Sequence, residues 1–139
     1  MNQDDEREFT LTGLTIRIRL HAADSNGTLS VIEEQLPPGT GSPLHKIRAD
    51  ATLYVIEGQV TITRGDTTIS ASAGDTIFIP RDTPRNVANT TASSARILVI
   101  VVPGGYEQFL QALHQAGPRL MEDRQLLEAI SARYGVEVL

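Results

Sequence analysis

Residues 37–58 read PPGTGSPLHKIRADATLYVIEG, and this stretch decides how the chain folds. Its apolar residues Ala51, Leu53 and Val55 share one parity, which places them on one face of a strand because successive strand side chains point to opposite sides. The closing Glu-Gly pair predicts a tight hairpin turn, where glycine tolerates a positive φ. The stretch therefore predicts short strands joined by turns.

Strand patterns continue outward from this stretch in both directions. Between Ile16 and Leu20 the apolar residues alternate with basic ones, which predicts a half-buried strand. Similar runs lie at residues 29–36, 59–63, 67–72, 76–79 and 96–102, separated by Gly, Pro, Asp and Asn. Many short strands at this spacing predict a mainly β protein built as a sandwich or barrel.

The spacing of the apolar residues changes after the Pro-Gly-Gly sequence at 103–105. From there they recur every three or four positions, which predicts two short helices separated by Pro118. Gly135 ends the second helix, and Val136 and Val138 indicate a terminal strand or a latch. The predicted organisation is a disordered acidic N-terminus at residues 1–8, a β-barrel at 9–103, and a C-terminal helical extension at 104–139 that packs on the barrel.

Composition excludes several kinds of site and partner. The chain has 139 residues and no cysteine, which excludes disulfides, thiolate metal sites and cysteine nucleophiles. A net charge of −5 opposes binding to phosphate backbones, so we expect no nucleic-acid partner. The longest apolar run, residues 97–103, is far shorter than the ~20 residues that span a bilayer, and the acidic start lacks an export signal. We therefore expect a cytoplasmic protein with no membrane partner.

Two segments resemble the conserved motifs of the cupin superfamily. In residues 37–58, the positions of Gly39, His45 and Gly58 have the spacing of the first motif. Residues 74–89, GDTIFIPRDTPRNVAN, resemble the second motif, and the residues that match it are Gly74, Pro80 and Asn89. Because both motifs occur in order with a hairpin's length between them, the chain is identified as a member of this superfamily. The resemblance implies a double-stranded β-helix, or jelly-roll barrel.

The C-terminal segment is similar to those of single-domain cupins related to quercetin dioxygenases, but the metal-binding positions differ. In the family, three histidines and a glutamate hold a metal ion, and those positions here are His45, Ile47, Ala51 and Arg85. One ligand of four remains, and a guanidinium beside the site would repel a cation. We therefore expect no metal and no other cofactor. One alternative stays open, in which a shift in register turns Asp50 inward beside His45.

Strand alternation predicts which residues line the interior of the barrel. His45 and Arg85 are the candidate catalytic residues, and the candidate ligand-binding residues are Ile47, Arg48, Ala51, Leu53, Val55, Val87 and Asn89. Together they form an apolar cup with one imidazole and one guanidinium. A buried arginine needs a negative partner, which is either a bound ligand or an internal carboxylate. The candidate carboxylates are those of Glu33, Glu34 and Asp50. Arg48 either lies at the mouth of the cup or is solvated.

Several functions follow from such a cup. In the first, a metal-independent cupin binds a small organic molecule, anionic or aromatic and polyketide-like, and acts as an isomerase, cyclase or lyase. His45 would transfer the proton, and Arg85 would hold an anionic group. Alternatives are a non-catalytic binding module, a structural barrel filled by its own side chains, and a metal-dependent, dioxygenase-like cupin with an atypical site. Small cupins form homodimers, so a homodimer is expected here.

Overall fold

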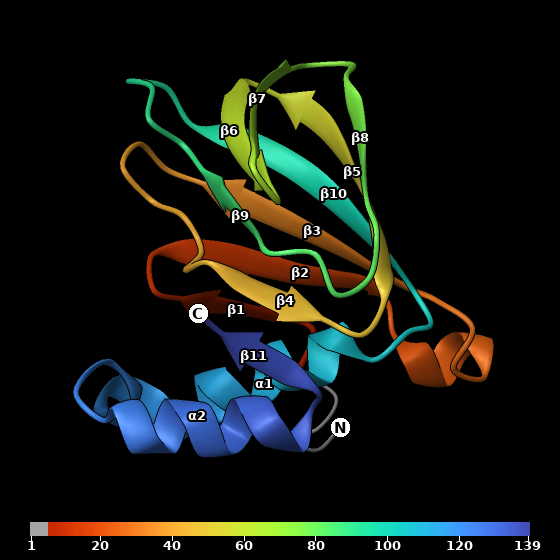
Figure 1. The fold of residues 1–139 in the computed structure, drawn as a ribbon, viewed down its shortest axis with the longest axis vertical. Helices are drawn as coiled ribbons and strands as arrows, with labels where there is room; N and C mark the ends of the chain where they lie inside the picture. Colours follow the sequence, from red (N-terminus) through yellow and green to blue (C-terminus); the bar gives the residue numbers. More distant parts are fainter. Residues whose placement is uncertain (1–5) are drawn as a thin grey trace.

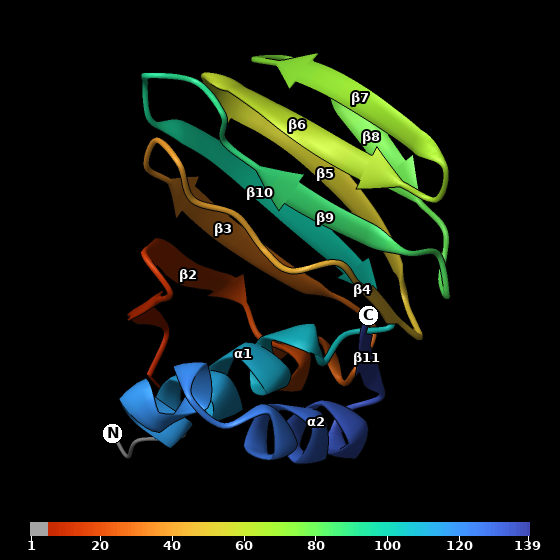
Figure 2. The ribbon, with the colours of Figure 1, turned by 60° about the vertical axis from the view of Figure 1, so that its left-hand side comes forward.

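Two antiparallel sheets face each other in the computed structural model, which describes residues 6–139 (Figures 1 and 2). The first sheet has the order β1 (Glu8–Leu11), β2 (Leu14–Leu20), β3 (Ser30–Leu36), β10 (Ala95–Val102), β5 (Asp50–Glu57) and β8 (Thr76–Ile79). The second has the order β11 (Val136–Val138), β4 (His45–Ile47), β9 (Arg85–Ala88), β6 (Gln59–Arg64) and β7 (Thr67–Ser72). These sheets confirm the predicted mainly β barrel.

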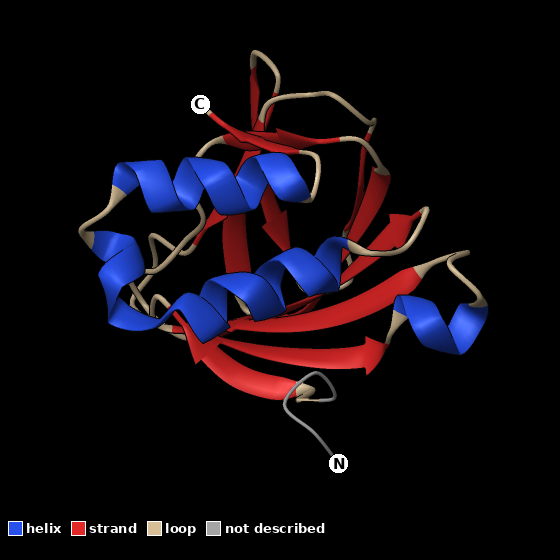
Figure 3. Ribbon diagram, turned by 90° about the horizontal axis from the view of Figure 1, so that it is seen from below, coloured by secondary structure: helices blue, strands red, loops and turns tan. Residues whose placement is uncertain are grey.

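The helices follow the barrel in sequence and lie across one side of it. They are α1 (Tyr106–Ala116), the short 3-10 turn η3 (Gly117–Met121) and α2 (Arg124–Arg133), and a further 3-10 turn, η2 (Ala22–Ser25), follows β2. Figure 3, viewed from the side of the helices, shows α1 and α2 in front of the strands. Residues 1–5 of the predicted disordered segment lie outside the described part of the chain, and β1 begins at Glu8. Within residues 6–139, no helix is long and apolar enough to cross a membrane.

Alternation along the central strands builds the core between the sheets. In β10, Ile97 and Val99 point inward, where they stand opposite Val55 and Leu53 of β5 in the antiparallel register. Ile62 of β6 is fully buried and belongs to the same cluster. The interior at this level is therefore filled by aliphatic side chains, and open space remains nearer the helices.

A buried carboxylate fixes the start of α1. Glu107 is fully buried and accepts hydrogen bonds from the Ala22 amide (2.6 Å) and the Ser30 hydroxyl (2.5 Å). The Gly105 amide donates to the same carboxylate over 3.1 Å. These bonds connect α1 to β3 and to the turn after β2. Because Tyr106 immediately precedes Glu107, they also determine where the first side chain of the helix lies.

The terminal strand β11 lies beside β4 and borders the open space near the helices. Val136 pairs with Ile47 and Val138 pairs with His45, so the last residues of the chain extend the second sheet beside β4. This is the strand predicted from the valines after Gly135. Its side chains Val136 and Val138 complete a wall that begins with α1 and α2.

Candidate functional site

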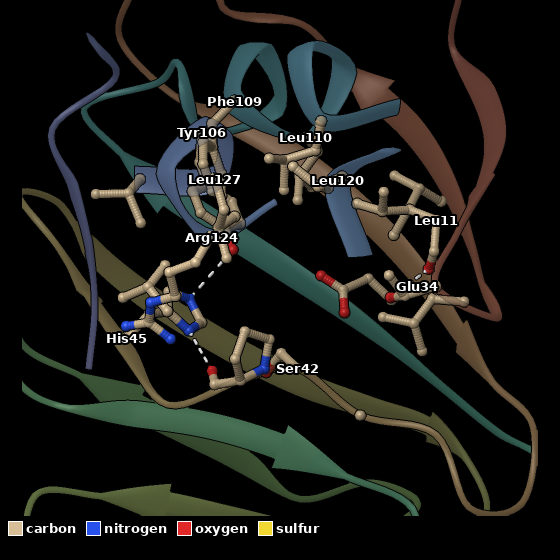
Figure 4. A pocket seen from close by; sticks show the side chains of 18 of the residues that line it. Leu11, Glu34, Ser42, His45, Tyr106, Phe109, Leu110, Leu120, Arg124 and Leu127 are labelled. Carbon is tan, nitrogen blue, oxygen red and sulfur yellow. Dashed lines mark hydrogen bonds between the residues drawn. The ribbon is translucent and has the colours of Figure 1, made fainter. Parts of the chain in front are cut away.

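A cavity of about 490 Å³ lies between the first sheet and the C-terminal helices. Its volume falls in the range of ligand pockets, roughly 300–1,000 Å³. Most of its wall is aliphatic or aromatic, as Figure 4 shows. The apolar lining comes from the β1–β2 hairpin, from α1 and η3, and from α2, and includes Leu14, Ile16, Leu110, Leu113, Leu120 and Leu127. The open space therefore lies between the barrel and the helices, whereas the interior of the barrel itself is largely filled by its own side chains.

One end of this cavity is polar and leads to a small recess inside the barrel. The residues that line both spaces are Glu34, Ser42, His45 and Tyr106. The recess has a volume of about 30 Å³ and reaches Arg85. A volume of this size holds roughly two or three water-sized groups, since a water needs on the order of 10–15 Å³. The head of a bound molecule could enter it while the remainder stays in the main cavity.

His45 lies on β4 at the boundary between the two spaces. Its Nδ1 is 2.7 Å from the carbonyl oxygen of Pro43, and because a carbonyl only accepts, Nδ1 carries the proton. The other ring nitrogen, Nε2, then accepts the hydrogen bond of the Tyr106 hydroxyl over 3.2 Å. Burial, together with the charge of Arg85, lowers the pKa of His45 to about 4. The imidazole is therefore neutral at pH 7, and both of its nitrogens are in use.

Tyr106 links the histidine to the arginine. Its ring is nearly parallel to that of His45, with 6.1 Å between centroids, and the Arg85 guanidinium carbon lies 5.5 Å from the tyrosine centroid. The latter contact is a cation–π interaction. Burial raises the pKa of Tyr106 to about 12, so its hydroxyl stays protonated and donates to the histidine.

Arg85 carries a charge that the protein does not neutralise by direct contact. Its side chain extends from β9, the residue is only 5% exposed, and its Nη1 is buried without a hydrogen-bond partner in residues 6–139. A buried polar group normally finds a partner, because leaving it unsatisfied costs free energy. The unsatisfied Nη1 therefore marks a place where an acceptor from outside the chain would be stabilised.

The carboxyl group of Glu34 faces the same interior from the opposite sheet. Figure 4 shows it pointing into the cavity, and within the described residues it forms neither an ion pair nor a hydrogen bond. Burial raises the pKa of Glu34 to about 7, against the opposing attraction of Arg85. At neutral pH this group can therefore gain or lose a proton.

The other two carboxylates considered as partners of Arg85 face outward. Glu33 forms ion pairs with Arg17 at 3.2 Å and Arg19 at 3.1 Å on the outer face of the first sheet. Asp50 pairs with Arg81 at 3.1 Å, which turns it away from His45. Neither carboxylate is therefore an internal partner of Arg85, and the alternative in which Asp50 turns inward beside His45 does not occur.

Five of the remaining candidate site residues lie inside the barrel, but only two of them reach the recess. Leu53 and Val87 line the recess near Arg85. Ile47, Ala51 and Val55 are buried in the core and contact neither space. Strand parity placed all five on interior faces, but parity carries no information about depth along the barrel.

Arg48 and Asn89 lie away from the cavity. Arg48 is exposed to solvent after β4. The Asn89 amide is buried and donates to the carbonyl oxygens of Leu36 and Ser93, each over 2.8 Å, so it ties two loops together. Conversely, the motifs and strand parity did not predict the contribution of Tyr106 or of the helical wall to the cavity. The sequence feature that could have indicated this wall is the apolar face of the helix that begins directly after Pro-Gly-Gly.

The donor set around His45 does not fit a divalent metal ion. The three other positions of the family's metal site hold Ile47, Ala51 and Arg85, which offer no lone pair and, in the case of Arg85, a positive charge. Across residues 6–139, no three His, Asp or Glu side chains gather where they could share an ion. No step of the site's chemistry is therefore assigned to a metal.

Comparison with known proteins places this geometry in context. The family model for the cupin domain matches residues 32–101. The HTH-type transcriptional regulator PuuR of Escherichia coli is 29% identical over 104 residues, which cover 74% of this chain but only 56% of the regulator. The chain thus spans little more than half the length of that relative. An uncharacterized protein of Methanocaldococcus jannaschii is 31% identical over 97 residues, covering 68% of this chain and 78% of that protein.

Solved structures agree with the family model on the fold. An RmlC-like cupin from Shewanella frigidimarina superposes with a TM-score of 0.63 at 18% identity, over 74% of this chain and 87% of that one. At this identity the likeness concerns the fold alone. Together with the two sheets, it confirms the predicted double-stranded β-helix with C-terminal helices.

Proposed function

This chain belongs to the cupin domain family, and from that membership we propose that it binds a small organic molecule, without a metal ion, in the cavity between barrel and helices. The ligand has an apolar, aromatic or polyketide-like body and an anionic or carbonyl oxygen at one end. That oxygen enters the recess and meets Arg85.

The observation that carries this proposal is the unsatisfied Nη1 of Arg85. A guanidinium that is 5% exposed and lacks a partner among the described residues is costly unless a ligand supplies the acceptor. A carboxylate, phenolate or carbonyl oxygen would accept a charge-assisted hydrogen bond there. Tyr106 and His45 orient the guanidinium through the cation–π contact and the hydrogen bond between them.

The apolar wall defines the rest of the ligand. Its aliphatic side chains offer no hydrogen bonds, so they favour a hydrophobic body whose burial contributes roughly 25 cal/mol per Å² of apolar surface. An aromatic or fused-ring skeleton suits such a wall, because it buries much apolar area with few rotatable bonds.

A catalytic version of this site is the second candidate, as an isomerase, cyclase or lyase that acts by proton transfer. His45 is a weak base here, because its pKa is about 4 and its Nε2 already accepts from Tyr106. Glu34 favours this candidate, because its carboxyl has a pKa near 7 and faces the cavity. The relationship to a protein named as a transcriptional regulator instead supports a non-catalytic binding module.

We further propose a homodimer formed through the outer face of the first sheet. Tyr54 and Phe78 are 40% and 50% exposed there, and their strands β5 and β8 are hydrogen-bonded neighbours. Exposed aromatic side chains on one sheet face are typical of association surfaces. Multi-angle light scattering of the purified protein tests this, and a monomer at micromolar concentration would contradict it.

The binding proposal is tested with a naphthalene carboxylate as the probe. Titration calorimetry should give saturable binding to the wild type, and Arg85→Met should weaken it at least tenfold. Arg133→Met is the matched control, because this substitution removes the same charge from an exposed position at the end of α2. Equal affinity of wild type and Arg85→Met, or no binding of any aromatic acid, would overturn the proposal. Elemental analysis of protein purified without chelator tests the metal-free part, and stoichiometric metal would refute it.

A further inference from the structure

Glu34 provides the cavity with a second polar contact, and we infer that the ligand carries a hydrogen-bond donor for it beside the oxygen that meets Arg85. The ligand class is an aromatic acid bearing a hydroxyl or amino group, with both polar groups at one end of an apolar body. This inference rests on the proposed function, since it describes the same cavity.

The two charged groups approach the same space from opposite sheets. Glu34 extends from β3 in the first sheet and Arg85 from β9 in the second, and both line the recess. They attract each other, as the effect of Arg85 on the carboxyl shows, yet they do not close into an ion pair. Each therefore keeps unused hydrogen-bonding capacity that points into shared space.

Other carboxylates of this chain behave differently when their role is to neutralise arginine. Glu33 accepts from Arg17 and Arg19 within 3.2 Å, and Asp50 accepts three hydrogen bonds from Arg81, two of them from its guanidinium. Glu34 has no such contact within residues 6–139, although a guanidinium shares its recess. Structural charge neutralisation thus does not account for its position.

The surroundings of Glu34 make an unused carboxyl costly. The inward-facing residues before and after it on β3, Ile32 and Leu36, are fully buried and apolar. Opposite it stand Ile16 on β2 and Ile97 on β10. A carboxyl in such surroundings is destabilised unless it meets a donor. A ligand O–H or N–H group would supply that donor, and the same ligand would satisfy Arg85 with its oxyanion.

The test compares a naphthalene carboxylate with its derivatives that carry one hydroxyl or one amino group at successive ring positions. Affinities are measured by calorimetry at pH 8, where the Glu34 carboxyl is ionised because its pKa is about 7. At least one derivative should bind about tenfold more tightly than the parent acid, the value of one good hydrogen bond to a charged group. This gain should disappear in Glu34→Met.

Controls separate this inference from the proposed function. Glu57→Met removes an exposed carboxylate from the far end of β5 and should leave the gain unchanged. If Glu34→Met does not fold, Glu34→Gln is used in its place. Its neutral amide oxygen is a weaker acceptor than a carboxylate, so only part of the gain in affinity should remain. The inference alone would be overturned if the parent acid bound through Arg85 but no derivative bound more tightly. It would also be overturned if the gain in affinity persisted in Glu34→Met. Failure of every acid to bind would overturn the proposed function as well.

Discussion

His45 and Arg85 are direct cross-strand partners in the antiparallel pairing of β4 with β9. Forty positions apart in the sequence, they come from the two family motifs and meet at the polar end of the cavity. Their proximity explains part of the lowered pKa of His45, because an adjacent guanidinium disfavours a second positive charge. The pair therefore consists of one permanent cation and one neutral hydrogen-bonding ring.

Replacing the arginine should affect stability and binding in opposite directions. Arg85→Met removes a buried cation whose Nη1 lacks a partner, so we expect the free energy of unfolding to stay equal or rise by about 1–2 kcal/mol. Binding of aromatic acids should be lost in the same variant. Urea denaturation at pH 7 measures the first effect. A loss of more than about 2 kcal/mol would mean that the guanidinium is stabilised by contacts inside the protein.

Glu34→Gln should change how stability depends on pH. The pKa of Glu34 is about 7 in the folded protein and near 4.5 when unfolded, so between these values the folded state holds a proton that the unfolded state releases. Stability from this group therefore falls as pH rises from about 4.5 to 7. Relative to wild type, Glu34→Gln should gain up to about 3 kcal/mol at pH 8 and nothing at pH 4.5. Denaturation midpoints across this range check the difference.

His45→Gln should produce the opposite trend. The folded pKa of about 4 lies below the ordinary 6.5, so between them the unfolded state binds a proton that the folded state does not. Stability from this group falls as pH drops from about 6.5 to 4. Relative to wild type, the variant should therefore improve toward pH 4. In the wild type, the opposite effects of Glu34 and His45 on stability nearly cancel between about pH 4.5 and 6.5. Removing one group therefore exposes the pH dependence due to the other. If stability depended on pH in the same way in all three proteins, both assignments would be refuted.

Tyr106→Phe should destabilise the protein without removing its ring contacts. The variant loses the hydroxyl that donates to Nε2 of His45 and leaves a buried acceptor unsatisfied, which costs about 1–3 kcal/mol. Tyr134→Phe is the control, because Tyr134 lies at the end of α2 and its hydroxyl forms no hydrogen bond within residues 6–139. The pKa of His45, followed by NMR, should also rise when Nε2 is released. An unchanged histidine titration would show that the hydrogen bond does not form in solution.

The barrel and its two key residues could be predicted from the sequence because they depend on local patterns. Parity, turns and motif spacing predict that His45 and Arg85 lie inside a β-barrel, and both side chains are buried there. The same parity also put Val55 with the ligand, whereas the structure places it in the packed core. Alternation distinguishes inside from outside, but how far the open space extends depends on packing between distant segments.

The parts that the sequence left undetermined are those set by tertiary contacts. Glu34 appeared only as one of several carboxylates near Arg85, because its lack of a partner depends on the distance between sheets. Asp50 could have turned either way, and its bonds to Arg81 in the loop after β8 decide its direction. The barrel motifs do not point to Tyr106, because it lies on the helix that follows the barrel.

The cavity draws its two ends from different segments of the chain. Strands β3, β4 and β9 supply polar side chains at one end, while α1, η3, α2 and β11 supply much of the apolar wall. The residues at the polar end and those of the apolar wall can consequently change independently of each other. Under the proposed function, a relative with the same barrel but a different C-terminal segment would keep the preference for an acidic head group and accept a different carbon skeleton. Exchanging tails between family members beyond Gly105 would then be a practical route to new ligand selectivity.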